Sequence, residues 1–280
     1  ASGCGKTTLL SCIVGMINLD GGEITVLGHQ TRADEIQKAG PKIGYMPQEI
    51  ALIGELTVKE TIYYFGKIFQ MDIEKLRDRY KMLKNLLELP RGDQRVEECS
   101  GGQQRRVSFA AAMIHEPDLL ILDEPTVGLD PILREKIWEF MLQVTRTSKL
   151  AIIITTHYID EAKQADRCGL MRNGILLAED TPNNIISRHN VENLEEAFLK
   201  LCMKRGASED AVEDDKPQVN VVHVPENLEL EERNDPDHIE SLDQSQQSQN
   251  TDTFRRRKYA WSTMRALFTK NYLQMKRQPA

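Results

Sequence analysis

The stretch Leu119-Leu120-Ile121-Leu122-Asp123-Glu124 joins four apolar residues to two acids. An unbroken apolar run of this length is typical of a strand that is covered on both faces of a parallel sheet. In an open sheet of this kind, ligands bind beyond the carboxyl ends of the strands. The two acids are therefore expected to face a bound ligand, with a solvated acidic turn as the plainer alternative.

The first eight residues, Ala-Ser-Gly-Cys-Gly-Lys-Thr-Thr, precede an apolar segment with helical character. Gly5-Lys6-Thr7 matches the second half of a phosphate-binding loop, G-x-x-x-x-G-K-[ST], whose first glycine would precede Ala1. The glycines of such a loop let backbone N–H groups turn toward phosphate oxygens at the positive end of a helix. Lys6 would contact the β- and γ-phosphates, and the Thr7 hydroxyl would bind Mg²⁺. An ordinary glycine-rich turn is the alternative, and the chain is expected to be a fragment.

The phosphate loop favours a functional interpretation of the two acids after the apolar strand. Asp123 suits ligation of Mg²⁺, either directly or through a water molecule, and Glu124 suits polarising an attacking water.

Segments with strand and helix patterns alternate along the rest of the chain. Short strands are expected at 23–27, 42–46, 119–122 and 150–154, and helices begin after Ser100 and Pro131. Asn173-Gly174 predicts a tight hairpin between 168–172 and 175–178. This order indicates an α/β fold with a mostly parallel sheet covered on both faces. Residues 52–104 show helical periodicity without strands and are expected to form a separate subdomain.

Charge is distributed unevenly toward the C-terminus. Residues 206–254 carry 14 Asp and Glu against 2 Lys and Arg, a net of −12, and are expected to be a disordered linker. Residues 255–280 carry 8 Lys and Arg and no acid, a net of +8. Trp261, Met264 and Phe268 fall on one side of a helical wheel there, which suits a cytoplasmic membrane surface. A nuclear-localisation-like run and a solvated helix are the alternatives.

The remaining composition excludes several classes of protein. The five cysteines form no CxxC pair, which indicates a reduced, cytosolic compartment. No apolar run approaches the roughly 18 residues that cross a bilayer. The first 205 residues carry a net charge of −3, which is the total of −7 minus the contributions of −12 and +8 from the two C-terminal segments. Because this part has no excess of basic residues, no nucleic-acid partner is expected.

Ser100-Gly101-Gly102-Gln103 looks like the LSGGQ signature of the ABC ATPases, with Cys99 in place of the leucine. The chain resembles that family in order as well as in content, over roughly residues 1–200. The matching segments are Walker A at 1–7, the Q-loop glutamine at 48, the signature at 99–103, Walker B at 119–124, the D-loop at 127–130 and the H-loop histidine at 157. The resemblance implies an ATPase domain over 1–205. Its fold would be a P-loop NTPase (RecA-like) core with a parallel sheet, plus an ABC α-helical subdomain at about 52–104.

The resemblance also implies roles for individual residues. Gln48, Glu124 and His157 would act in hydrolysis, with Gln48 and His157 sensing the γ-phosphate. The residues expected to bind ATP are Ser2, Gly3, Cys4, Gly5, Lys6, Thr7, Thr8, Ser100, Gly101, Gly102, Gln103 and Asp130. Those expected to hold Mg²⁺ are Thr7, Gln48 and Asp123. Ser100 and Gly102 would bind ATP held by an opposite subunit, and Asp130 would organise the dimer interface.

The order of ATPase domain, acidic linker and basic segment resembles the G and H subfamilies of eukaryotic half-transporters. This implies an integral membrane protein whose ATPase domain lies on the cytoplasmic face and whose basic segment leads into its own transmembrane domain. The partners would be a second ABC ATPase domain and the membrane surface, and the function would be export of a lipid or hydrophobic compound. A soluble ABC ATPase is the alternative, and Glu124 and His157 argue against a non-hydrolysing regulatory subunit.

Overall fold

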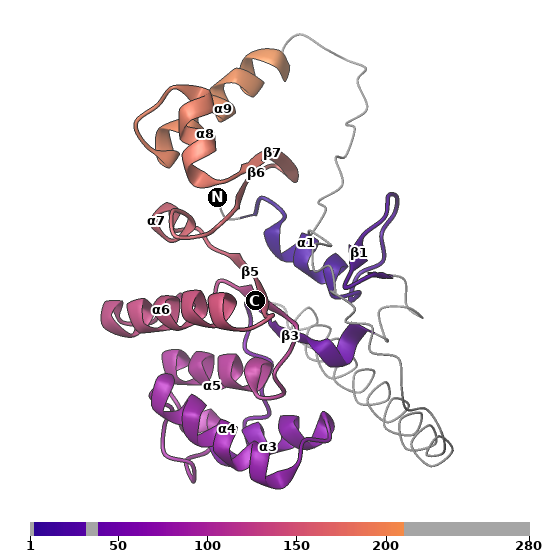
Figure 1. Ribbon diagram of the computed structural model, residues 1–280, viewed down its shortest axis with the longest axis vertical. Helices are drawn as coiled ribbons and strands as arrows, with labels where there is room; N and C mark the ends of the chain where they lie inside the picture. The colour runs from indigo at the N-terminus through magenta and orange to yellow at the C-terminus, as the bar shows by residue number, and fades with distance from the viewer. Residues whose placement is uncertain (1–2, 32–38, 210–280) are drawn as a thin grey trace, which may run out of the picture.

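The computed structural model describes residues 3–31 and 39–209 of the 280-residue chain. Ser2, linker residues 210–254 and the basic segment 255–280 lie outside the described residues. The elements, labelled as in Figure 1, are α1 (Lys6–Ile13), β1 (Thr25–Val26), β2 (His29–Gln30), η1 (Gly40–Lys42), β3 (Ile43–Met46), α3 (Val58–Ile68), α4 (Ile73–Leu86), η2 (Val96–Glu98), α5 (Gly101–Met113), β4 (Leu119–Asp123), α6 (Pro131–Thr147), β5 (Ala151–Thr155), α7 (Ile159–Ala162), β6 (Cys168–Arg172), β7 (Ile175–Asp180), α8 (Pro182–His189) and α9 (Leu194–Glu209).

Three parallel strands in the order β3-β4-β5 form the central sheet. The middle strand β4 is buried along its whole length, as its apolar run requires. α1 lies on one side of these strands, and α5 and α6 lie on the other (Figure 1). The predicted α/β fold with a parallel sheet is confirmed. The parallel pairing also places the carboxyl ends of the three strands at one edge.

The helical lobe of the molecule holds α3, α4 and the first part of α5. Thr57 and Glu60 form a capping box that starts α3, and the Asp72 side chain caps α4. The helical pattern expected from 57 to 89 is therefore two helices, separated by a turn in which Gln70 has a positive φ of 55°. Residues 52–104 contain no β-strand beyond one isolated bridge.

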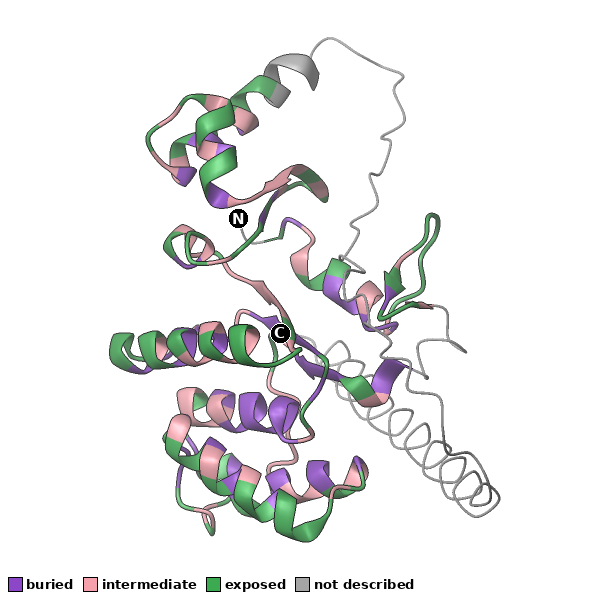
Figure 2. Cartoon of the chain, viewed as in Figure 1, coloured by how far each residue is buried: buried purple, intermediate pink, exposed green. Residues whose placement is uncertain are grey.

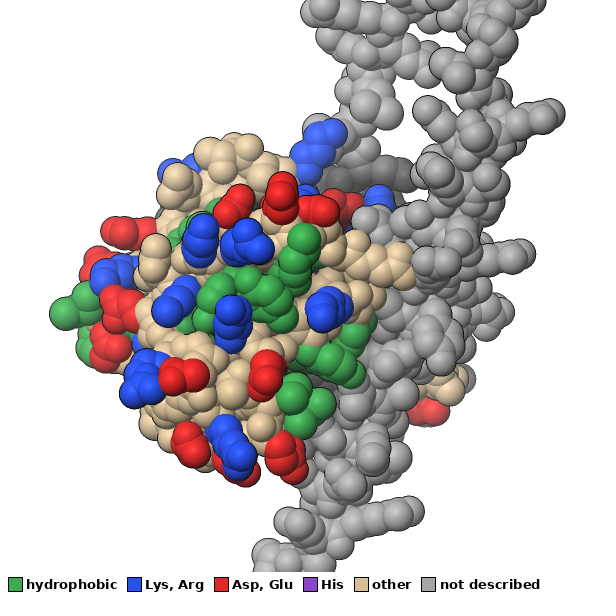
Figure 3. Space-filling view, turned by 90° about the horizontal axis from the view of Figure 1, so that it is seen from below, with side chains coloured by type: hydrophobic (Ala, Val, Ile, Leu, Met, Phe, Trp, Pro, Cys, Tyr) green, Lys and Arg blue, Asp and Glu red, His purple; other side chains and the backbone are tan. Residues whose placement is uncertain are grey.

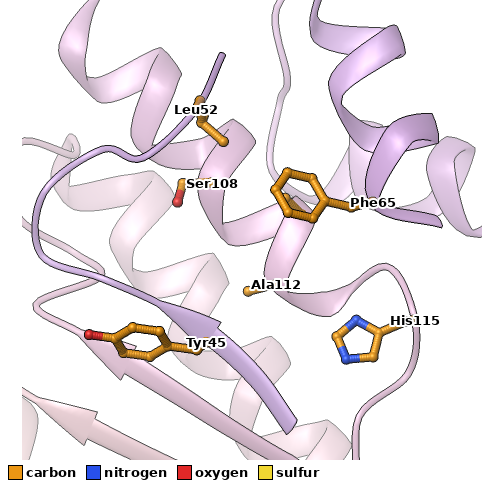
Figure 4. Close-up of a pocket in the computed structure, with 7 residues that line it drawn as sticks. Tyr45, Leu52, Phe65, Ser108, Ala112 and His115 are labelled. Atoms are coloured by element: carbon orange, nitrogen blue, oxygen red, sulfur yellow. The ribbon is translucent and has the colours of Figure 1, made fainter. Parts of the chain in front are cut away.

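The helical lobe and the central sheet share one hydrophobic core. Buried residues of α3, α4 and α5 belong to the same cluster as those of β3 and β4, and α5 is buried where it faces the other helices and the sheet (Figure 2). A small cavity with room for about one water remains between β3, α3 and α5 (Figure 4). Its lining residues are Tyr45, Leu52, Phe65, Ser108, Ala111, Ala112 and His115.

The outer face of the helical lobe is partly apolar. Seen from below, hydrophobic side chains gather there among Lys and Arg side chains (Figure 3). Helices α3 and α4 and the turn between them also carry hydrophobic side chains that are partly buried and pack against the core: Tyr63, Tyr64, Ile68, Met71, Met82 and Leu86. None of the helices among residues 3–31 and 39–209 combines the length and the apolar character that crossing a membrane requires.

The C-terminal part of the described chain contains the expected hairpin. β6 and β7 pair antiparallel, and Asn173 and Gly174 both have positive φ, as a type I′ turn requires. α8 and α9, which the sequence patterns do not predict, pack with β6 in a second, smaller apolar cluster. α9 continues to Glu209, four residues into the segment expected to be linker from 206.

Gly44 on β3 lies against the backbone of α5 with no room for a side chain. A Cβ atom at Gly44 would lie 2.2 Å from the Ala112 backbone oxygen and 2.9 Å from the Leu120 side chain. Because a backbone atom cannot move alone, we expect Gly44→Ala to lower the free energy of unfolding by about 3 kcal/mol. Gly21→Ala is the matched control, since a Cβ there meets no atom within 4 Å. Equilibrium urea unfolding measures both, and equal midpoints for the two variants would contradict the expectation.

Candidate functional site

The ends of the three parallel strands bring distant polar residues to one place. Gln48 follows β3 by two residues, Asp123 ends β4 and Glu124 comes next, and His157 follows β5 by two residues. The N-terminus of α1 adds Lys6 and Thr7. These are the positions at which ligands bind in open α/β sheets.

The Glu124 carboxylate is the partner of Lys6, Gln48 and His157, and Gln48 in turn binds Thr7. The Thr7 hydroxyl donates to Gln48 Oε1 at 3.2 Å, and Gln48 Nε2 donates to Glu124 Oε2 at 3.3 Å. Lys6 Nζ lies 3.9 Å and His157 Nδ1 lies 3.5 Å from Glu124 Oε1. Five of the residues expected in the site are therefore in one connected network, in which the Glu124 side chain is only 13% exposed.

Glu124 is held in a backbone conformation that non-glycine residues seldom adopt. Its φ is +50°, in the left-handed region, which costs roughly 1–2 kcal/mol for an L-residue. Its N–H group donates to the backbone oxygen and to the hydroxyl of Thr155, both at 3.1 Å. The end of β5 therefore fixes the amide side of this residue.

Asp123 is fully buried, and one of its two carboxylate oxygens lacks a hydrogen-bond partner among the described residues. The Thr155 hydroxyl donates to its Oδ1, whereas Oδ2 is buried with no hydrogen-bond partner in the described part of the chain. Burial, with a smaller contribution from Asp123, raises the pKa of the neighbouring Tyr45 above its usual range. A buried carboxylate oxygen without a donor is a suitable neighbour for a cation or its bound water.

The residues present fit Mg²⁺ bound together with phosphate. The described residues contain no cluster of three His, Cys, Asp or Glu side chains that could form a cage of protein ligands. Mg²⁺ does not need one, because it keeps several waters and binds phosphate oxygens beside one or two protein groups. Thr7 and Gln48, already joined by a hydrogen bond, together with Asp123 would hold it.

The phosphate loop begins α1 without a side-chain cap. Gly3 and Gly5 have positive φ values of 78° and 94°, and Gly5 occupies the N-cap position. Cys4 is buried, its Sγ lies 3.7 Å from Lys6 Nζ, and its carbonyl accepts the N–H group of Gly174. The turn between β6 and β7 therefore holds the backbone of the phosphate loop through this hydrogen bond. Thr8 is exposed on the first turn of α1.

The signature residues lie at the start of α5. Ser100 and Gln103 form a capping box there, and the side of Gly101 is open, with no atom within 4 Å of a Cβ built on it. A Cβ at Gly102 would lie 2.9 Å from the backbone oxygen of Gly128 in the D-loop. Asp130 caps α6 by accepting from the N–H group of Leu133 at 2.9 Å.

The signature residues thus lie beside the D-loop, to which Asp130 belongs, and neither they nor Asp130 take part in the described bonds of the network around Glu124. Their polar side chains serve as helix caps in this chain, and the expected binding of ATP by residues 100–103 stays a prediction.

Sequence patterns did not identify three side chains that support the site. Thr155 bonds to Asp123 and Glu124, Arg105 donates to the backbone beside them, and the buried Glu161 accepts from the hydroxyls of Thr126 and Thr156. The only signal for Thr155 and Thr156 is their place at the end of an apolar strand. Arg105 and Glu161 lie within helices whose patterns give them no special position.

Comparisons with known proteins agree on one family. Residues 1–127 match the family described as ABC transporter. The ABC transporter G family member 23 of Dictyostelium discoideum is 42% identical over 202 residues, which are 72% of this chain and 29% of that protein. The Nod factor export ATP-binding protein I of Rhizobium sp. (strain N33) is 40% identical over 193 residues, 67% of this chain and 62% of that protein. The chain thus spans less than two thirds of the length of either relative.

A solved structure supports the same fold. It is a dimeric ATP-binding cassette in a post-hydrolysis state, bound to ADP and Pi. It is 28% identical, has a TM-score of 0.59, and the match covers 65% of this chain and 82% of that one.

We expect Thr155→Val to lower the free energy of unfolding by about 1–3 kcal/mol. The substitution removes the hydroxyl that bonds to the buried Asp123 carboxylate and to the Glu124 N–H group. Thr147→Val is the matched control, because the exposed Thr147 hydroxyl donates only within α6 and should matter by less than about 0.5 kcal/mol. Chemical unfolding at pH 7 measures both variants. Equal stability would remove Thr155 from its supporting role.

Proposed function

This chain belongs to the ABC transporter family, whose ATP-binding domain it carries, and from this premise we propose that it binds and hydrolyses ATP with Mg²⁺ in a head-to-tail dimer. The observation that carries the proposal is the network that joins Lys6, Thr7, Gln48 and His157 to the single carboxylate of Glu124. These residues come from four separate segments of the chain.

In the proposed mechanism, the loop at the start of α1 binds the phosphates. Its backbone N–H groups and Lys6 would neutralise the β- and γ-phosphates. Thr7, Gln48 and Asp123 would hold Mg²⁺, which offsets the charge that develops on the phosphate oxygens. Thr7 and Gln48 would then exchange their mutual hydrogen bond for contacts with the ion.

Glu124 would polarise the water that attacks the γ-phosphate. Its restricted exposure and its fixed backbone hold the carboxylate in place, which suits a reaction that depends chiefly on positioning and electrostatics. His157, 3.5 Å from that carboxylate, would contact the γ-phosphate and report its loss. Gln48 would sense the same group.

The second half of each ATP site would come from another ATPase domain. Ser100, Gly101 and Gly102 start a helix, and an exposed helix N-terminus attracts anions. Because the open side of Gly101 leaves room for a ligand, the ATP held by one subunit could bridge to the signature of the other. The dimeric cassette with ADP and Pi supports this arrangement by analogy.

The coupled process would be export across a membrane. The Nod factor export protein among the relatives supports an export direction, and a lipid or hydrophobic substrate is proposed from the G-type resemblance. The ATPase domain would lie on the cytoplasmic face of an integral membrane protein. Its own transmembrane domain and the membrane surface near 255–280 would be further partners, and both lie outside the described residues.

Glu124→Gln is expected to reduce steady-state ATP turnover at least about 100-fold, because the amide cannot accept a proton from the attacking water. ATP should then accumulate in a closed dimer, visible by analytical ultracentrifugation. Glu135→Gln, an exposed position on α6, is the control for the loss of one charge. Turnover like that of the unsubstituted protein would remove Glu124 from catalysis.

The head-to-tail arrangement predicts that two inactive variants rescue each other. Lys6→Ala would disable the phosphate loop, and Gly101→Asp would repel the phosphates while fitting the open space at Gly101. Each variant alone should be inactive. A 1:1 mixture should recover about a quarter of normal turnover, because half of the randomly paired dimers contain one intact site. No recovery in a mixture that still dimerises would contradict a composite site.

A further inference from the structure

Arg105 is a buried cation in the middle of the molecule. It lies in α5, five residues after Ser100, and only 8% of it is exposed. Burial lowers the pKa of its guanidinium, and the nearby Glu124 and Asp123 carboxylates oppose that shift. Moving an arginine out of water is costly unless its N–H groups find acceptors.

The acceptors of Arg105 are backbone oxygens of two loops in the candidate site. Its Nε and Nη2 donate to the Glu124 carbonyl at 3.0 and 2.5 Å, and Nη2 also donates to Asp123 O at 3.1 Å. Its Nη1 donates to the carbonyl of Gln48 at 3.0 Å. One planar side chain therefore joins the helix of the signature to the ends of β3 and β4.

These contacts complete the support of the left-handed residue Glu124. Thr155 binds its N–H group from β5, and Arg105 binds its carbonyl from α5, so both sides of the residue are fixed. The carbonyl of Gln48 is bound by the same guanidinium. One residue therefore binds the backbone of both Gln48 and Glu124, in addition to the direct bond between their side chains.

We propose that Arg105 is a positioning residue that aligns Gln48 and Glu124 for hydrolysis and ties both to the helix that starts at the signature. The proposal rests on the function proposed above. Arg105 does not touch the phosphate loop through these contacts, so its effect falls on the chemical step and not on nucleotide binding. A lysine cannot replace it fully, because an ammonium lacks the planar set of donors that reaches three carbonyls.

The adjacent Arg106 is a matched control on the same helix. It also donates to backbone carbonyls, those of Leu87 at 3.2 Å and Glu88 at 2.6 Å. These carbonyls end α4 in the helical lobe and belong to none of the residues proposed to act in hydrolysis. The two arginines therefore make similar bonds with different partners.

The test compares Arg105→Met, Arg105→Lys and Arg106→Met in the full-length protein. We expect Arg105→Met to lower kcat by about 10- to 100-fold, because a small misplacement of catalytic groups has an effect of this size. KM for ATP and the Kd of a fluorescent ATP analogue should change less than about threefold, since Lys6 and Thr7 are untouched. Arg105→Lys should recover part of kcat, and Arg106→Met should keep kcat within about twofold.

Amide hydrogen exchange gives a readout that does not depend on activity. Arg105→Met should speed exchange in 47–50 and 124–127, whereas Arg106→Met should do so near 87–90. Normal kcat in Arg105→Met, or an equal fall of kcat in both Met variants, would overturn the proposal. Absence of ATP hydrolysis in the unsubstituted protein would instead overturn the proposed function, and the exchange pattern would still decide whether Arg105 holds the two loops.

Discussion

The parallel register of β3, β4 and β5 is the constraint on which the rest of the site depends. Met46 pairs with Leu122, and Asp123 pairs with Thr155, so the three strands end level with one another. Gln48, Glu124 and His157 come together for this reason, although they are far apart in the sequence. A slip of one residue would turn the side chains of a strand to the other face and dismantle the network.

One residue of the site, Glu124, has a strained backbone. The turn after β4 requires a left-handed backbone at Glu124, which glycine would adopt at less cost but without a carboxylate. The chain keeps the carboxylate and anchors the peptide on both sides, through Thr155 and Arg105. Such a conformation persists only where its surroundings over-determine it. The supporting side chains are therefore as much a part of the site as the residues with motif signatures.

The sequence predicts the parts of the site that local patterns specify. An apolar run ending in acids, a Gly-Lys-Thr loop and a helix-capping Ser-Gly-Gly are local patterns, and the strand and the two helices that they imply are present. The hairpin that Asn173-Gly174 implies is present as well. Arg105 has no such pattern, because its partners are backbone carbonyls, which every residue carries. The sequence patterns also do not predict α8 and α9. They bury few apolar side chains, chiefly Ile185 in α8 and Leu194 and Ala197 in α9, against the hairpin that precedes them in the sequence.

The shared hydrophobic core limits how the helical lobe and the central sheet could move relative to each other. α5 connects the helical lobe to the central sheet. Ser100 caps its N-terminus, Arg105 follows one turn later, and its last turns pack against β3 at Gly44. Close-packed elements rearrange between discrete arrangements and do not deform smoothly. A displacement of α5 must therefore either carry the backbone of Gln48 and Glu124 with it or break the bonds of Arg105. Under the proposed function, a phosphate that pulls on the signature of one subunit would in this way act on the water-activating carboxylate of that same subunit.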